Sequence, residues 1–243
     1  MERVIFFRRL TVFTVNFVNF TQEVREKLNR VFPSASVAPF INSGDGFIAP
    51  QPLMAAPPMG GEGVPWQLFS MELTFRFVPN SINVISQNVT INKEDEETLV
   101  RKMHEALCRM LQSLSIERVL LMAYAPSIAV DETPDFLVND YFKKVMRVPT
   151  VGEAVPQHMD LRVSYIQKKK LRDDREESLT CVCKLDQGKK RDQQARMDIP
   201  CVIMEADLNM RNPENAYTMG DLDAFFAQSI DWAEVFVDAF LKG

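Results

Sequence analysis

Two amphipathic segments dominate the pattern of hydrophobic and polar positions along the chain. Each begins with a capping residue, Asn92 or Thr218, followed three positions later by an acid, Asp95 or Asp221. This spacing satisfies free amide donors at a helix start. Apolar residues then recur at three- and four-residue steps, from Leu99 to Leu114 in the first segment and from Leu222 to Phe240 in the second. Such a stripe packs on a sheet or another helix, so the pattern predicts two long helices.

Strand-like runs rich in Val, Ile, Phe and Thr precede both helices. Residues 4–20 predict one long strand, and Thr21 caps a short helix that ends before Pro33. Further strands are predicted at 66–77, 82–91, 119–129, 159–166, 178–185 and 199–208, and a short helix at 136–146. The connections 167–177 and 186–198 are highly charged, which is typical of the hairpin ends of an antiparallel sheet.

This order of elements predicts an α+β protein with two units, each an antiparallel sheet packed by a long amphipathic helix. The N-terminal strand–helix unit spans residues 1–133 and the C-terminal strand–strand–strand–helix unit spans residues 134–243. We find no residue-level repeat between them, so the likeness is either an internal duplication or a common α+β arrangement.

A long loop at residues 33–65 separates the first predicted strands. It holds seven of the 14 prolines and five of the nine glycines, yet it is too apolar for an ordinary solvated linker. Long loops of this kind are often functional or disordered. One interpretation is a surface loop held down by its apolar side chains. The other is a flap or a segment that docks on a partner, for which the candidate residues are Phe40, Phe47, Ile48, Leu53, Met54 and Met59.

The composition narrows the function classes. A net charge of −5 argues against a dedicated nucleic-acid binder, which usually carries a basic excess. The longest uncharged stretch, residues 46–61, holds four prolines and three glycines, so we expect no membrane span. Asn16 and Asn19 interrupt the apolar N-terminal run, which argues against a secretory signal and favours a cytoplasmic location. The four cysteines are expected to be reduced, although a disulfide involving Cys201 stays an alternative.

Candidate chemistry is sparse. The two histidines, His104 and His158, lack a recognisable nucleophile motif and are expected on the surface. Glu205 and Asp207 flank Ala206 in a predicted strand, so their carboxylates share one face and could share a metal ion. A metal-dependent hydrolase using these two acids is therefore the alternative function. No cofactor is predicted.

The element order carries two resemblances. The stretch 116–149, with Arg118-Val119-Leu120 and Val138-Asn139-Asp140-Tyr141-Phe142, resembles an uncharacterised group of prokaryotic two-part α+β proteins. The strands-then-helix order of the second half is similar to that of the SecB-like export chaperones. That resemblance implies binding of unfolded chains along apolar grooves, and it transfers no individual residue.

The leading hypothesis is a non-enzymatic binding or assembly protein that engages a protein or peptide partner through apolar surface. Thirteen methionines and 17 phenylalanines accompany only two tryptophans and four tyrosines. Methionine adapts its shape and recurs at surfaces that accept several partners. A homodimer stays an open alternative.

Overall fold

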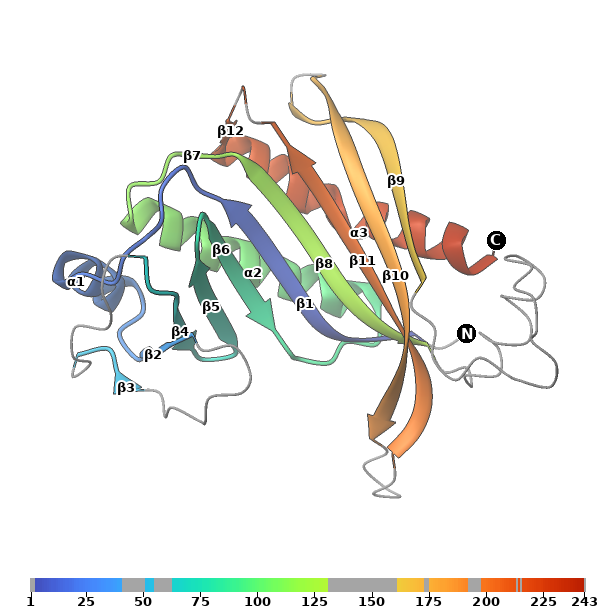
Figure 1. Cartoon of the computed structure of the whole chain (residues 1–243), viewed down its shortest axis with the longest axis horizontal. Coiled ribbons are helices and arrows are strands. Elements are labelled where there is room, and N and C mark those ends of the chain that lie inside the picture. The colour runs from blue at the N-terminus through green and yellow to red at the C-terminus, as the bar shows by residue number, and fades with distance from the viewer. Residues whose placement is uncertain are drawn as a thin grey trace.

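The computed structural model describes residues 3–40, 51–54, 63–130, 161–172, 175–191, 198–212, 214 and 216–242. Within these residues, one sheet of ten strands runs in the order β3-β2-β4-β5-β6-β1-β8-β11-β10-β9, and neighbouring strands are antiparallel (Figure 1). The strands are β1 (Arg3–Phe13), β2 (Ser36–Pro39), β3 (Gln51–Pro52), β4 (Trp66–Ser70), β5 (Leu73–Val78), β6 (Ser81–Ser86), β8 (Leu121–Val130), β9 (Leu161–Lys170), β10 (Glu176–Arg191) and β11 (Asp198–Arg211). The protein is therefore an α+β protein, as predicted, but the described strands outside the small β7–β12 ladder form one large antiparallel sheet instead of a separate sheet in each of two units.

The two long helices lie on the same face of this sheet (Figure 1). They are α2 (Lys93–Ser113), which contacts β6 and β1, and α3 (Met219–Lys242), which contacts β8, β11 and β10. The helices also contact each other, and the shorter α1 (Gln22–Val31) contacts α2. A small ladder between β7 (Arg118–Val119) and β12 (Tyr217–Thr218) precedes α3. None of the described helices combines the length and apolarity needed to cross a bilayer.

The centre of the sheet is the pairing of β1 with β8. β1 also pairs with β6, so the strand near the N-terminus lies between the strands before and after α2. Leu10 lies opposite Val84 on one side and opposite Tyr124 on the other. One continuous sheet thus joins both parts of the chain. The predicted boundary between residues 133 and 134 falls in 131–160, outside the described residues.

The helix starts form as the capping residues predict. The Thr21 side chain accepts a hydrogen bond from the Val24 amide at 3.2 Å, and Asn92 Oδ1 accepts one from the Asp95 amide at 2.9 Å. At the start of α3 the bond runs from the Thr218 amide to Asp221 Oδ2 at 2.8 Å. These contacts satisfy amide donors that a helix start leaves free, so the expected helices are confirmed.

Four predicted strands are shorter or divided in the structure. The strand predicted at 82–91 ends at Ser86, and the one predicted at 119–129 is divided between β7 and β8. The strand predicted at 4–20 ends at Phe13. The strand predicted at 66–77 is the hairpin of β4 and β5, whose turn includes Met71, with a φ of 51° and a side chain 98% exposed. The apolar alternation changes phase there, from even positions before Met71 to odd positions after it, which is the trace of the turn. The helix predicted at 136–146 lies outside the described residues.

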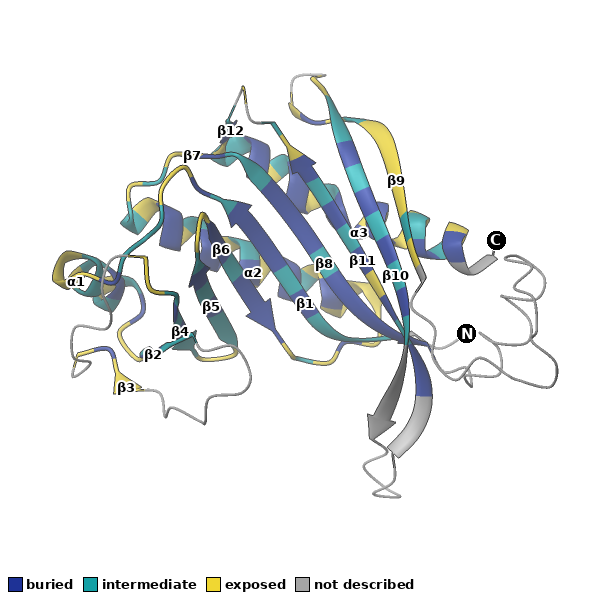
Figure 2. Cartoon of the chain, viewed as in Figure 1, coloured by how far each residue is buried: buried dark blue, intermediate teal, exposed yellow. Residues whose placement is uncertain are grey.

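The core lies between the sheet and the two long helices, and the central strands are mostly buried (Figure 2). Three charged residues are buried among those that the structure describes: Arg8, Glu96 and Asp221. Arg8 of β1 is fully buried and pairs with Glu96 of α2, which is 1% exposed. The Arg8 Nη2 and Glu96 Oε2 atoms are 2.7 Å apart. The other Glu96 contacts are Tyr124 OH at 2.7 Å and Thr90 Oγ1 at 2.6 Å. A charge in the core is tolerated when it is paired and hydrogen-bonded in this way.

Candidate functional site

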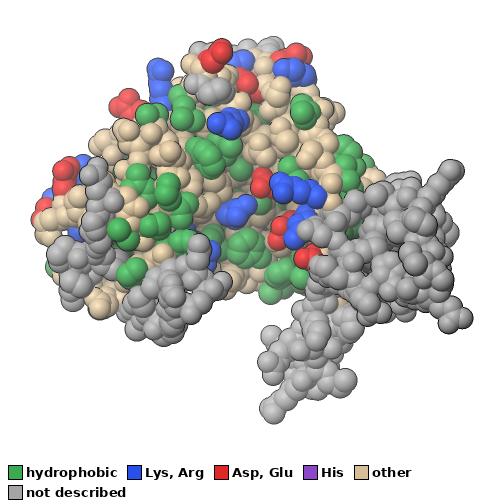
Figure 3. Space-filling model, viewed as in Figure 1, with side chains coloured by type: hydrophobic (Ala, Val, Ile, Leu, Met, Phe, Trp, Pro, Cys, Tyr) green, Lys and Arg blue, Asp and Glu red, His purple; other side chains and the backbone are tan. Residues whose placement is uncertain are grey.

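The sheet face opposite α2 and α3 carries no helix among the described residues and holds a groove of about 490 Å³. Figure 3 shows hydrophobic and basic side chains mixed on this face. Alternation along each strand places these side chains, because every second residue points away from the helices. The groove is lined by Phe7, Arg9, Thr11, Phe13, Phe40, Arg76, Val78, Ser81, Asn83, Ile85, Leu121, Ala123, Asp207 and Asn209. It therefore crosses β5, β6, β1, β8 and β11.

Two arginines give the groove its charge. The Arg76 guanidinium lies over the Phe40 ring, 4.9 Å from the ring centroid. Burial, and after it the like charge of Arg9, lowers the pKa of Arg76. Arg9 Nε and Arg76 Nε are both buried, and neither has a hydrogen-bond partner among the described residues. The groove therefore offers an apolar floor beside two guanidinium groups, whose positive charge an anionic group can offset.

The predicted partner-binding residues divide between three locations. Phe40 lines the groove and Met54 is 71% exposed, so both are available to a partner. The prediction for Leu53 is wrong, because its side chain is 1% exposed and belongs to the hydrophobic core. Phe47, Ile48 and Met59 lie outside the described residues.

Glu205 and Asp207 share the open face of β11, as their spacing predicts. Asp207, however, is paired with Arg9, with Nη2 and Oδ2 at 3.5 Å, and accepts a hydrogen bond from Asn209 at 3.4 Å. Glu205 is exposed and lies opposite Lys184 of β10. Neither acid belongs to the group of three side chains that, among the described residues, lie close enough together to hold a metal ion. Because the Arg9 guanidinium already pairs with Asp207, the positions of Glu205 and Asp207 do not favour the hydrolase alternative.

A second, smaller pocket of about 170 Å³ lies between the sheet and the start of α2 and the middle of α3. Tyr124 and Glu96 reach its wall, together with apolar residues such as Ile128, Ile230 and Val237. Burial, followed by the charge of Glu96, raises the pKa of Tyr124 well above its usual value. The phenol is thus held neutral as a donor to Glu96. These polar groups satisfy one another, which is typical of a structural network rather than a reactive site.

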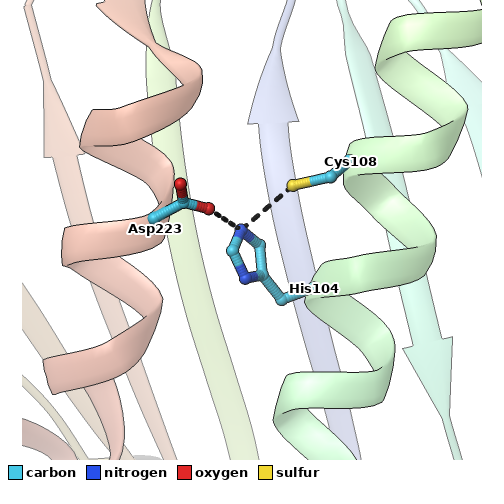
Figure 4. Close-up of side chains that lie close together, drawn as sticks. All are labelled: His104, Cys108 and Asp223. Atoms are coloured by element: carbon cyan, nitrogen blue, oxygen red, sulfur yellow. Dashed lines mark hydrogen bonds and ion pairs between the residues drawn. The ribbon is translucent and has the colours of Figure 1, made fainter.

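The prediction of a surface position for His104 is wrong. Its side chain is 15% exposed and lies between α2 and α3 beside Cys108 and Asp223 (Figure 4). Burial lowers the pKa of His104, with Asp223 and Glu105 opposing that shift. Cys108 is half-buried. His158 lies outside the described residues.

No disulfide joins any of the four cysteines, all of which the structure describes. Cys181 and Cys183 share one face of β10, with Sγ atoms 3.7 Å apart. Cys201 lies opposite Gly188, far along β10 from both, so the alternative disulfide does not form.

Sequence reasoning missed both the arginine groove and the His104 cluster. One signal for the groove was available, because Arg9 and Arg76 alternate with core residues in their strands. The cluster had a weaker signal, the four-residue spacing of His104 and Cys108 on one helix face. Its third member, Asp223, comes from a helix far away in the sequence. No family model and no curated protein matches the chain.

Proposed function

We propose that this protein is a non-enzymatic binding or assembly protein that engages an extended segment of a partner polypeptide along the open sheet face. The observation that carries the proposal is the groove itself, in which Phe7, Phe13 and Phe40 lie beside the guanidinium groups of Arg9 and Arg76. Apolar surface with a few well-placed polar groups is the usual make-up of a binding site. The preferred segment combines apolar side chains with carboxylates.

The carboxylate preference follows from the charges that line the groove. Arg9 and Arg76 are close enough for their positive charges to repel each other. Among the described residues, Asp207 forms an ion pair with Arg9 but not with Arg76. A carboxylate from the partner would offset the charge of the Arg76 guanidinium. The phenylalanines would cover the apolar part of the same segment.

The order of elements in the second half of the chain supports this proposal. β9, β10, β11 and α3 keep the element order on which the resemblance to SecB-like chaperones rests. We also propose that the chain consists of two similar units, β1 with β4–β6 and α2, and β8 with β9–β11 and α3. This division moves β8 into the second unit, whereas the boundary predicted between residues 133 and 134 places it in the first. In each unit a first strand pairs with the last strand of a three-strand meander, and a helix follows that meander. The homodimer stays a prediction, and β9, with Ile166 75% exposed, is the sheet edge on which a second copy would pair.

The experiment measures binding of three labelled synthetic peptides by fluorescence anisotropy. One alternates leucine with glutamate, one alternates leucine with lysine, and one alternates serine with glutamate. We expect only the leucine–glutamate peptide to bind, because it alone supplies both apolar and anionic groups. Equal binding of the leucine–lysine peptide, or no binding of any, contradicts the proposal.

Variants then locate the binding surface. Arg76→Gln removes one charge from the groove and is expected to weaken binding by up to about tenfold, equivalent to about 1.4 kcal/mol. The control is Arg101→Gln, which removes an exposed arginine from α2 on the other face of the sheet and should leave affinity unchanged. If both variants bind like the unmodified protein, the groove is not the binding surface.

A further inference from the structure

A second group of side chains converges on the helix side of the sheet, away from the groove. His104 and Cys108 are four residues apart on α2, so they share one face of that helix. Asp223 reaches the same point from the start of α3 (Figure 4). The His104 ring is held by the Phe226 ring, with centroids 5.0 Å apart. The cluster therefore joins the two long helices.

The distances in this cluster match those of a metal chelate. His104 Nε2 lies 3.2 Å from Cys108 Sγ and 3.3 Å from Asp223 Oδ1, and all three atoms lie within 4.8 Å of one another. A tetrahedral zinc ion binds nitrogen, oxygen and sulfur at about 2.0–2.3 Å, which separates neighbouring ligand atoms by about 3.5 Å. The three atoms are thus already placed around a common centre.

Hydrogen bonding alone explains the cluster poorly. A neutral imidazole nitrogen is either one donor or one acceptor, yet Nε2 faces both a carboxylate oxygen and a thiol. A Cys–His–Asp catalytic triad would also need the acid on Nδ1 and the thiol on Nε2, whereas both contact Nε2 here. Burial raises the pKa of Cys108 to about 11, so without a cation the thiol stays protonated and is a weak nucleophile. A cation at the centre of the cluster accepts one lone pair from each of the three atoms, His104 Nε2, Cys108 Sγ and Asp223 Oδ1.

We propose that His104, Cys108 and Asp223 bind one divalent cation of the zinc type, with water in the fourth position. Thiolate and imidazole ligands select zinc and its soft neighbours over magnesium and calcium, which prefer oxygen. The ion reaches the site from the side of Asp223, whose side chain is 65% exposed. On binding, the Cys108 thiol releases its proton to solvent and the thiolate bonds to the metal. The ion then cross-links α2 to α3.

The test uses the full chain, stripped of metal with a chelator, and cobalt(II) alone as a spectroscopic probe. We expect one equivalent of cobalt to bind, with the intense visible bands of tetrahedral coordination and a thiolate-to-cobalt charge-transfer band. Zinc alone should displace it. A pale octahedral spectrum, or binding well below one equivalent, overturns the proposal.

Variants assign the ligands. Cys108→Ser should remove the charge-transfer band, and Asp223→Asn should weaken cobalt binding by at least about tenfold. Asp231→Asn is the matched control, because Asp231 is an exposed acid on the same helix that pairs with Lys93. A charge-transfer band that persists in Cys108→Ser, or equal losses in the two Asp variants, overturns the assignment.

Thermal unfolding supplies a second readout. At a free zinc concentration about 100 times Kd, the melting temperature should rise by about 5–10 °C, and Asp223→Asn should abolish most of this rise. Asp223 is mostly exposed, so this variant is expected to fold even if Cys108→Ser does not. An unchanged melting temperature in the unmodified protein overturns the proposal.

Discussion

The buried pair of Arg8 and Glu96 allows a quantitative prediction. Glu96→Leu removes a carboxylate that receives four polar contacts at 2.6–3.0 Å, two from Arg8 and one each from Thr90 and Tyr124. It leaves the fully buried Arg8 with no charge partner among the described residues. Loss of one member of a buried ion pair costs about 3–5 kcal/mol. For a chain of this size, that loss lowers the melting temperature by about 6–20 °C.

The assay is urea unfolding followed by far-ultraviolet circular dichroism and tryptophan fluorescence, with coincident transitions as the check on two-state behaviour. Glu97→Leu is the matched control, because Glu97 is the next residue of α2 and its side chain is 55% exposed. We expect this control to change the free energy of unfolding by less than about 0.5 kcal/mol. A cost for Glu96→Leu no larger than the cost for Glu97→Leu would refute the reasoning.

A double-mutant cycle separates the charge from the packing. Arg8→Met combined with Glu96→Leu removes both charges, so the double variant should be more stable than Glu96→Leu alone by at least about 2 kcal/mol. Additive losses in the two single variants would show that the pair does not act as a unit.

Three further changes test other parts of the fold. The pKa of Tyr124 is raised above the value of about 10 expected in the unfolded chain, so its contribution to stability is present below pH 10 and is lost as the pH rises above it. Tyr124→Phe should therefore reduce the slope of unfolding free energy against pH between 10 and 11 by up to about 1.4 kcal/mol per pH unit, measured by urea unfolding at each pH. Asn92→Ala removes the cap of α2 and should cost about 1 kcal/mol, while an equal stability would contradict the capping role. Met71→Gly should raise the unfolding free energy by about 0.5 kcal/mol, because its φ of 51° favours glycine, and a loss of stability would show that the Met71 side chain matters.

Local signals in the sequence predicted the helices and most of the strands. Caps at Thr21, Asn92 and Thr218, together with regular apolar stripes, depend on neighbours within a few residues, so they can be identified without tertiary information. The sheet order could not be predicted in this way. The position of β1 between β6 and β8 depends on pairings between residues 68 or more positions apart.

The functional candidates were harder to predict for the same reason. Arg8 alternates with Leu10 and Val12, which indicates a charge in the core, but its partner Glu96 resembles an ordinary acid in the first turn of a helix. His104 and Asp223 meet only because α2 and α3 pack side by side. The loop residue Leu53 was misjudged because its apolar character suits a core as well as a docking surface.

The pairing of β1 with β8, called here the β1–β8 seam, has a consequence for how the protein unfolds. These two strands hold together parts of the chain that are more than 100 residues distant, and separating them would bare two long rows of backbone amides and carbonyls at once. Partial melting of one half is therefore costly, so both halves should lose their structure in a single transition. The amides along the seam should exchange with heavy water more slowly than those of β9 at the margin.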